Sequence, residues 1–170
     1  NKIPTNKRVM LALDVSSSMT WEGCGGMPSV TPRVGSAAMA MVTMRTESDY
    51  LVTGFTHGLE VLDLSPKMRL DDVCNKVDNL NFGATDCSLP MIYALENNLK
   101  FDAFVVYTDS ETWAGRSHPV EALRDYREKT GIPAKLIVVG MEANDFTIAD
   151  PDDAGMLDVV GFDTTAPSVM

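Results

Sequence analysis

The chain has 170 residues, and its 24 acidic and 14 basic side chains give it a formal net charge of −10. Its 45% of hydrophobic and 22% of charged residues are typical of one folded globular domain and exclude a disordered tail. No apolar run approaches the roughly eighteen residues that span a bilayer, and the acidic balance disfavours a module that binds nucleic-acid phosphates, because such contacts need lysine or arginine.

Short apolar runs rich in β-branched residues predict the strands of a sheet. The first run, Arg8–Asp14, is almost continuously apolar and ends in an acid, which is typical of a strand buried on both faces. Only His57 and Gly58 separate the second run from the third, so a hairpin and one antiparallel strand are expected there. The predicted strands cover 8–14, 50–56, 59–64, 104–109, 134–140 and 157–162.

Helical patterns separate these runs. Pro119 lies near the start of the last pattern and Gly131 follows its end, as helix start and stop signals do. The alternation predicts an α/β fold in which a mainly parallel central sheet, with one antiparallel edge strand, carries helices on both faces. The predicted helices cover 34–46, 70–80, 89–99 and 118–129.

The three cysteines do not form a metal-binding pattern. Cys24, Cys74 and Cys87 lack the spacing of a zinc site, and only His57 and His118 are available to complete one. Buried or inert thiols in a reducing, intracellular compartment are therefore expected.

Oxygen-bearing side chains follow the first predicted strand in an Asp-x-Ser-x-Ser pattern. Asp14, Ser16 and Ser18 can point one carboxylate and two hydroxyls at a shared position beyond the strand end. These hard ligands suit Mg²⁺ or Mn²⁺ rather than zinc or copper. The triplet alone fits ordinary turn chemistry equally well, because serine hydroxyls also close local hydrogen bonds.

Two other loops strengthen the case for a metal. Thr85 precedes a predicted helix, and Asp109 ends another central strand, so both are expected at the same sheet edge as Asp14. Together the residues match the five-residue pattern of a metal-ion-dependent adhesion site, and over its whole length the chain resembles a von Willebrand factor A domain. The resemblance implies a Rossmann-like fold with one Mg²⁺ or Mn²⁺ ion bound by Asp14, Ser16, Ser18, Thr85 and Asp109. It also implies a protein partner that offers the metal a carboxylate.

Three features next to this pattern allow more than one role. Asp86 either caps the following helix, in competition with Ser88, or supports the ligands from behind. Glu111 either gives similar support or is solvated. The glycine- and proline-rich segment 21–32 predicts an irregular loop that delays the next helix and can cover the site or present a contact surface.

Longer stretches resemble one branch of this family, the A domains of the Ro/SS-A autoantigen ribonucleoproteins. The resemblance implies a domain, residues 1–170, excised from a larger cytoplasmic and nuclear protein. That parent carries a ring of helical repeats, which binds Y RNA and misfolded noncoding RNA in RNA quality control. The stretches that carry the resemblance are 83–92, 108–112, 118–119, 122–127, 132–141, 146–153 and 155–158.

Alternatives remain for the site and for two charged segments. The domain can be a structural one with an empty metal site, or a metal-dependent phosphoryl-transfer enzyme, although Ser16 stands where a covalent phosphatase would favour a second acid. No phosphate loop or nucleophile elbow occurs, so no enzymatic activity is expected. The acidic run 150–153 predicts a turn followed by a helix N-terminus, and Arg124 and Arg127 predict solvated ion pairs along their helix.

Overall fold

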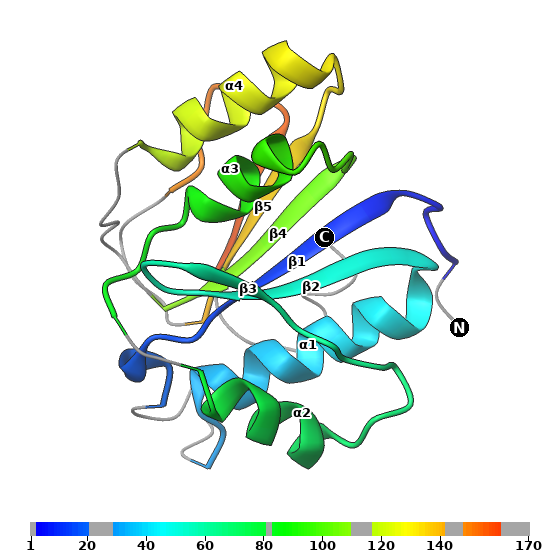
Figure 1. The fold of residues 1–170 in the computed structure, drawn as a ribbon, viewed down its shortest axis with the longest axis vertical. Coiled ribbons are helices and arrows are strands. Elements are labelled where there is room, and N and C mark those ends of the chain that lie inside the picture. Colours follow the sequence, from blue (N-terminus) through cyan, green and yellow to red (C-terminus); the bar gives the residue numbers. More distant parts are fainter. Residues whose placement is uncertain (1–2, 21–28, 81–82, 110–116, 142–147, 161–170) are drawn as a thin grey trace.

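A six-stranded sheet runs through the middle of the molecule (Figure 1). The computed structural model describes residues 3–20, 29–80, 83–109, 117–141 and 148–160. The strands are β1 Arg8–Asp14, β2 Asp49–Phe55, β3 Leu59–Val61, β4 Ala103–Thr108, β5 Lys135–Gly140 and β6 Met156–Val160. They lie in the order β3-β2-β1-β4-β5-β6, and every neighbouring pair is parallel except β2 and β3. The predicted mainly parallel sheet with one antiparallel edge strand is confirmed.

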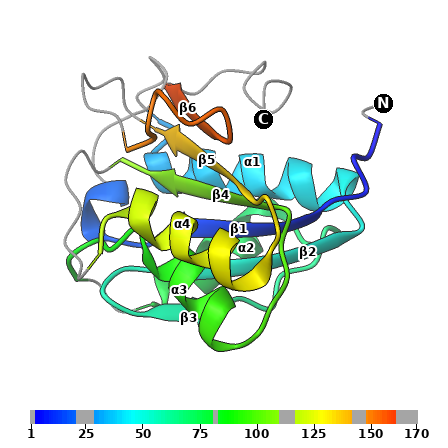
Figure 2. The same cartoon turned by 90° about the horizontal axis from the view of Figure 1, so that it is seen from above.

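Helices cover both faces of the sheet, as predicted. The helices α1 and α2 pack on one face, and α3 and α4 pack on the other; Figure 2 shows α1 across the sheet from α3 and α4. A short 3-10 helix, η1 (Ser17–Thr20), directly follows β1. The α-helix bounds are α1 Pro32–Thr46, α2 Leu70–Asp78, α3 Leu89–Glu96 and α4 Pro119–Thr130.

Alternation along the central strands divides the core into two layers. In β1, Leu11 and Leu13 face the core beneath α1 and α2, whereas Met10 and Ala12 face the core beneath α3 and α4. All four are at most 1% exposed, because this central strand is covered on both faces. The near-continuous apolar run in the sequence is the direct consequence.

Local capping explains where two of the helices begin and end. Thr31 accepts a hydrogen bond from the Val34 N–H at 3.3 Å, so α1 starts at Pro32, two residues before the predicted start. His118 caps α4 by accepting the Val120 N–H through Nδ1 at 3.2 Å, and Gly131 ends that helix in a left-handed conformation (φ 70°).

Three elements are shorter than their hydrophobic patterns predict. The strand expected over 59–64 stays paired as β3 only to Val61. The helices expected over 70–80 and 89–99 end at Asp78 and Glu96. After α3, Asn98 adopts a left-handed conformation (φ 53°), and the Leu99 N–H donates to the Ala94 carbonyl at 2.8 Å. The apolar pattern continues beyond the helix because Leu99 still packs against the core.

The helix predicted after the acidic run 150–153 is wrong. The run forms a turn, in which the Asp153 N–H donates to the Asp150 carbonyl at 3.1 Å, and the chain then enters β6. Arg127 of α4 pairs with Asp153 and donates to the Ala134 carbonyl at 2.7 Å. The prediction that Arg127 forms an ion pair along its own helix is therefore also wrong, because Arg127 pairs with a carboxylate from another segment.

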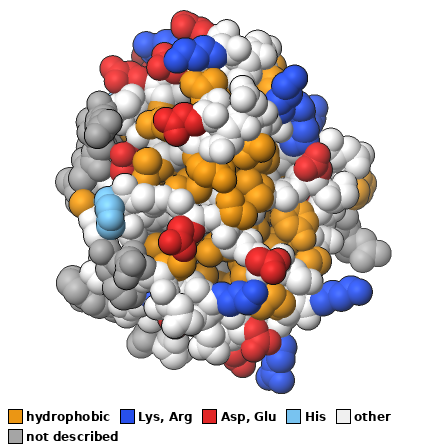
Figure 3. All heavy atoms as spheres, in the orientation of Figure 1, with side chains coloured by type: hydrophobic (Ala, Val, Ile, Leu, Met, Phe, Trp, Pro, Cys, Tyr) orange, Lys and Arg blue, Asp and Glu red, His pale blue; other side chains and the backbone are white. Residues whose placement is uncertain are grey.

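No helix in the described ranges is long and apolar enough to cross a membrane. On the face seen in Figure 3, apolar side chains gather between α3 and α2, while acidic and basic side chains are interspersed around them. Apolar side chains that are only partly buried pack against the margin of the core, among them Leu59, Ile92 and Leu95.

Candidate metal centre

Two acids meet at the carboxyl edge of the sheet because their strands are neighbours. Asp14 is the last residue of β1, and Asp109 follows the last residue of β4. The two strands are parallel, with Leu13 opposite Tyr107. Their carboxyl ends therefore point the same way, and ligands of such sheets bind at that edge.

The turn after β1 is shaped by its own polar groups. Asp14 Oδ1 accepts the Ser16 N–H at 2.8 Å, and the Ser16 carbonyl accepts the Met19 N–H at 3.2 Å as η1 begins. Met19 is fully buried and anchors the turn in the core. The hydroxyls of Ser16 and Ser18 lie 3.1 Å apart as a result.

The loop that carries Thr85 is fastened to the end of β2. The Asp86 N–H donates to the Thr56 carbonyl at 2.9 Å, one residue beyond β2. The Thr85 hydroxyl lies 3.4 Å from Asp14 Oδ2, to which it donates. Thr85 therefore contacts the carboxylate of Asp14, although the two residues lie seventy-one positions apart in the sequence.

All five predicted metal ligands form one contiguous group, which we call the oxygen cluster: Asp14, Ser16, Ser18, Thr85 and Asp109. The contact chain runs from the Ser16 hydroxyl to that of Ser18, which donates to Asp109 Oδ1 at 3.1 Å. Three separate segments therefore supply carboxylate and hydroxyl oxygens to one place, the donor set that suits Mg²⁺ or Mn²⁺. Within the described residues, no group of three or more His, Cys, Asp or Glu side chains is placed to hold a metal, so hydroxyls would have to complete this site.

Burial makes the two carboxylates of the oxygen cluster hard to ionise. Asp14 has no exposed surface, and its burial raises the pKa of its carboxyl, although hydrogen bonds from Ser16 and Thr108 act in the opposite direction. Burial also raises the pKa of Asp109, against a hydrogen bond from Ser18. The donors to Asp14 among the described residues are neutral: the Ser16 N–H and the hydroxyls of Thr85 and Thr108. A cation would compensate this buried charge, so the residues present fit a divalent metal.

Sequence reasoning did not identify Thr108 as part of the site. It is the last residue of β4, is 1% exposed, and donates its hydroxyl to Asp14 Oδ2 at 2.7 Å. This bond holds Oδ2 of Asp14, whereas the Ser16 N–H bonds the other carboxylate oxygen, Oδ1. A polar residue directly before the strand-end acid Asp109 was the available signal.

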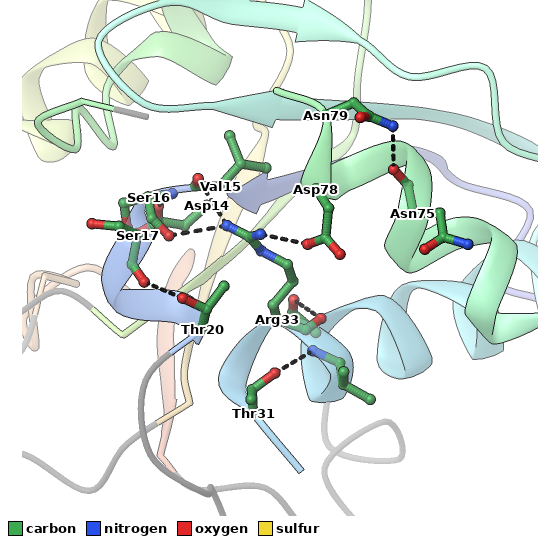
Figure 4. A network of polar contacts seen from close by, with 12 residues as sticks. Asp14, Val15, Ser16, Ser17, Thr20, Thr31, Arg33, Asn75, Asp78 and Asn79 are labelled. Carbon is green, nitrogen blue, oxygen red and sulfur yellow. Dashed lines mark hydrogen bonds and ion pairs between the residues drawn. The ribbon is translucent and has the colours of Figure 1, made fainter. Parts of the chain in front are cut away.

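Arg33 was also missed, and it lies beneath the turn after β1 (Figure 4). Its Nη2 donates to the carbonyls of Val15 and Ser16 at 3.1 and 3.2 Å, and its Nη1 forms an ion pair with Asp78 at the end of α2. The residue is 3% exposed. The available signal was a charged residue in the first turn of a helix rich in alanine and methionine.

Two further acids, Asp86 and Glu111, follow predicted ligands closely in the sequence. Asp86 Oδ1 accepts both the N–H (3.0 Å) and the hydroxyl (2.5 Å) of Ser88, the residue that precedes α3. The prediction that Asp86 caps the helix is wrong, because the cap position belongs to Ser88, which makes no side-chain cap bond; Asp86 instead holds Ser88. Glu111 and most of the glycine- and proline-rich segment, 21–28, lie outside the described residues.

Known proteins resemble the chain over its full length. The family model of the Ro60 vWA domain, a von Willebrand factor A domain, matches residues 8–170. The chain is 48% identical over 170 residues to the RNA-binding protein RO60 of Deinococcus radiodurans and 46% identical over 171 residues to that of Caenorhabditis elegans. It spans only 32% and 26% of these relatives.

The fold agrees with a solved structure at the same level of identity. The crystal structure of the Deinococcus radiodurans RO (RSR) protein superposes with a TM-score of 0.91 at 48% identity. The match covers 99% of this chain and 34% of that one. The resemblance inferred from the sequence is thereby confirmed at the level of the domain family.

Proposed function

Because the chain belongs to the Ro60 von Willebrand factor A domain family, we propose that its oxygen cluster binds one Mg²⁺ or Mn²⁺ ion and docks a carboxylate-bearing protein partner. The observation that carries this proposal is the chain of contacts from Ser16 through Ser18 to Asp109, joined by the bond between Thr85 and Asp14. These oxygens come from three segments that only the fold brings together.

The protein's own residues set how much positive charge such a site retains. A bound Mg²⁺ or Mn²⁺ supplies a cation to which a glutamate or aspartate of a partner can bind. Direct binding by both Asp14 and Asp109 would neutralise a divalent ion. Binding by Asp14 and the hydroxyls of Ser16, Ser18 and Thr85 would leave it positive, so the position of Asp109 controls the attraction for a partner.

The acidic surface does not prevent binding of an acidic partner. The chain carries a net charge of −10, which repels carboxylates at long range. Salt screens exposed charges beyond about 8–10 Å at physiological ionic strength. Close to the oxygen cluster, the local charge of the ion therefore outweighs the distant acids.

RNA contacts belong mainly to other parts of a larger parent protein. We propose that the parent's helical-repeat ring binds Y RNA and misfolded noncoding RNA, and that this domain serves protein interaction; we expect the parent in the cytoplasm and the nucleus. The relatives are named RNA-binding proteins, and this chain corresponds to about a third or less of each. The net charge of −10 supports this division. Tight binding of Y RNA by the 170-residue chain at physiological salt in a gel-shift assay would contradict it.

We propose no catalytic role for the oxygen cluster. Asp14, which ends a central strand where a covalent phosphatase would place its acceptor, is fully buried and held by hydrogen bonds from Ser16 and Thr108. His118, one of the two histidines, caps α4. Hydrolysis of a generic phosphate ester that disappeared in Asp14→Ala would overturn this statement.

Calorimetric titration of the 170-residue chain with Mn²⁺ and with Mg²⁺ tests metal binding. We expect one metal ion to bind per chain. We expect Asp109→Asn to lower the metal affinity, because this variant removes one carboxylate of the oxygen cluster, the one that Ser18 contacts. Asp49→Asn is the matched control, since it removes the same charge from an exposed acid at the start of β2, on the opposite edge of the sheet.

Two results would contradict the proposal. One is the absence of a binding signal for either ion at millimolar concentration, which would favour a structural domain with an empty site. The other is an equal loss of affinity in Asp109→Asn and Asp49→Asn, because this would reflect net charge and not a ligand set. If the ion binds as expected, pull-downs with and without a chelator then identify carboxylate-bearing partners.

A further inference from the structure

We infer that Arg33 is a positioning residue that holds the turn after β1 in the shape that metal binding requires. The inference rests on the proposed metal function of the oxygen cluster. It concerns a residue that bonds to the backbone of Val15 and Ser16 and acts on the predicted ligands through that backbone.

One nitrogen of the Arg33 guanidinium donates to the backbone carbonyls of two consecutive residues. Nη2 lies 3.1 Å from the Val15 carbonyl and 3.2 Å from that of Ser16, while Nη1 pairs with Asp78 (Figure 4). Arginine suits this task because its planar fork presents several donors in fixed directions. The contact joins three elements, namely the turn after β1, the start of α1 and the end of α2.

Ser16 is fixed at both of its backbone polar groups. Its N–H donates to Asp14 Oδ1 at 2.8 Å, and its carbonyl accepts from Arg33 and from the Met19 N–H. With both ends held, the Ser16 hydroxyl points toward Ser18 at 3.1 Å. Removal of Arg33 would leave the Val15 carbonyl without this donor and free the turn to rotate the hydroxyl away.

Burial strengthens the case that this arginine has a specific task. Its side chain is 4% exposed, although that of Asp78 is 51% exposed. A buried cation costs several kcal/mol of desolvation unless its donors are well paired. Asp78 supplies the opposite charge to Nη1, and the two carbonyls accept from Nη2, so the guanidinium is held against the turn.

Positioning and charge predict opposite effects on metal affinity. A positive guanidinium next to a cation site repels the cation, so its removal by charge alone would tighten binding. If Arg33 instead holds the turn, its removal weakens binding. Changes to residues that orient metal ligands typically reduce affinity about 10- to 100-fold.

The test compares Arg33→Met, Arg33→Lys and Arg127→Met in the 170-residue chain by calorimetric titration with Mn²⁺. Methionine keeps the volume without charge or donors, whereas lysine keeps the charge and one donor group. Arg127 is the matched control, because it likewise bonds a backbone carbonyl, that of Ala134, and an acid, Asp153, but far along the chain from the oxygen cluster. Thermal melts and circular dichroism establish that each variant is folded at the titration temperature.

We expect Arg33→Met to weaken Mn²⁺ binding at least about tenfold, Arg33→Lys to recover part of the affinity, and Arg127→Met to leave it unchanged. Hydrogen exchange of the metal-free protein gives a second readout. The amides of Ser16 and Met19 should exchange faster in Arg33→Met than in the wild type, while those of β5 keep their protection.

Tighter or unchanged Mn²⁺ binding in Arg33→Met would overturn the inference, as would an equal loss in Arg127→Met. If the wild type binds no metal at all, the proposed function fails separately. Hydrogen exchange then decides the role of Arg33 alone, and unchanged exchange at Ser16 and Met19 would refute it. Should Arg33→Met fail to fold, Arg33→Lys and Asp78→Asn provide the same comparison, with a smaller loss expected for the half-exposed Asp78.

Discussion

Replacing Asp14 by asparagine should separate the metal function of the oxygen cluster from its stability. In the wild type, a fully buried carboxylate accepts the Ser16 N–H at 2.8 Å and the Thr108 hydroxyl at 2.7 Å. Asparagine can keep the first bond through its carbonyl oxygen, and its NH2 group can donate to the hydroxyl of Thr108, which rotates to accept. The second hydrogen of the NH2 group can point to the Thr85 hydroxyl, which loses its acceptor oxygen, so the variant removes a buried charge and keeps polar contacts on both sides of residue 14.

The metal-free variant should be as stable as the wild type or more stable. Burial raises the pKa of Asp14 in the folded chain above its unfolded value, so the folded state binds more protons. The free energy of unfolding contributed by Asp14 thus falls as the pH rises from the unfolded pKa through the raised one. Above the unfolded pKa, the buried carboxyl of Asp14 therefore costs the metal-free protein stability, and asparagine relieves this cost.

Metal should reverse this order of stability. A ligand at about one hundred times its dissociation constant stabilises the folded state by about 2.7 kcal/mol. For a chain of 170 residues, each kcal/mol shifts the melting temperature by about 2–4 °C, so the wild type should gain about 5–11 °C. Asp14→Asn should gain almost nothing, because it lacks the buried carboxylate.

Thermal melts with chelator and with saturating Mn²⁺ measure both effects, and Asp49→Asn serves as the control for loss of one negative charge. Two results would refute the reasoning. An Asp14→Asn protein that still gains several degrees with Mn²⁺ would show that Asp14 is not a ligand. A metal-free variant much less stable than the wild type would show that the buried carboxylate is needed for folding and is not a cost.

Three further changes test the surroundings. Thr108→Val should weaken Mn²⁺ binding about tenfold by calorimetry, since it removes a bond that orients a ligand; unchanged affinity would contradict this. Tyr126→Phe should lower the free energy of unfolding in urea by about 1–3 kcal/mol, because it leaves the buried Phe101 N–H without its 2.7 Å acceptor. Hydrogen bonds from Arg8 lower the pKa of Asp102 to about 2. The pair therefore stabilises the fold at pH values above the ordinary pKa of 3.8, and this stabilisation is lost as the pH falls through about 2. Asp102→Asn should cost only about 0.5–1 kcal/mol at neutral pH, given partial exposure, and should flatten the acid limb of the stability curve.

Much of the fold follows from local sequence patterns. The continuous apolar run of Arg8–Asp14 requires cover on both faces, and the short connection through His57 and Gly58 allows only an antiparallel neighbour. Once strands and helices alternate, right-handed crossovers place the carboxyl ends of the parallel strands at one edge. For this reason, the positions of Asp14 and Asp109 could be predicted before any coordinates.

Element ends were less predictable where local polar bonds decide them. Thr31 begins α1 two residues early, and Asn98 turns the chain after α3 while the apolar pattern continues. The acidic run 150–153 satisfies the composition of a helix start but forms a turn, because the next residues pair with β5 as β6. Hydrophobic periodicity identifies which residues are buried. It does not determine whether a helix, a strand or a turn places them in the core.

Periodicity in the sequence predicted the α/β fold class, whereas the domain family and the five residues of the oxygen cluster were predicted from their resemblance to a known family. The contacts of Thr108 with the buried carboxylate, of Arg33 with the turn and of Arg127 with Asp153 follow only from the folded structure. The two arginine contacts join segments 17 and 26 residues apart. A long side chain has many partners within reach in an unfolded chain, and only the packing of helices on the sheet selects one.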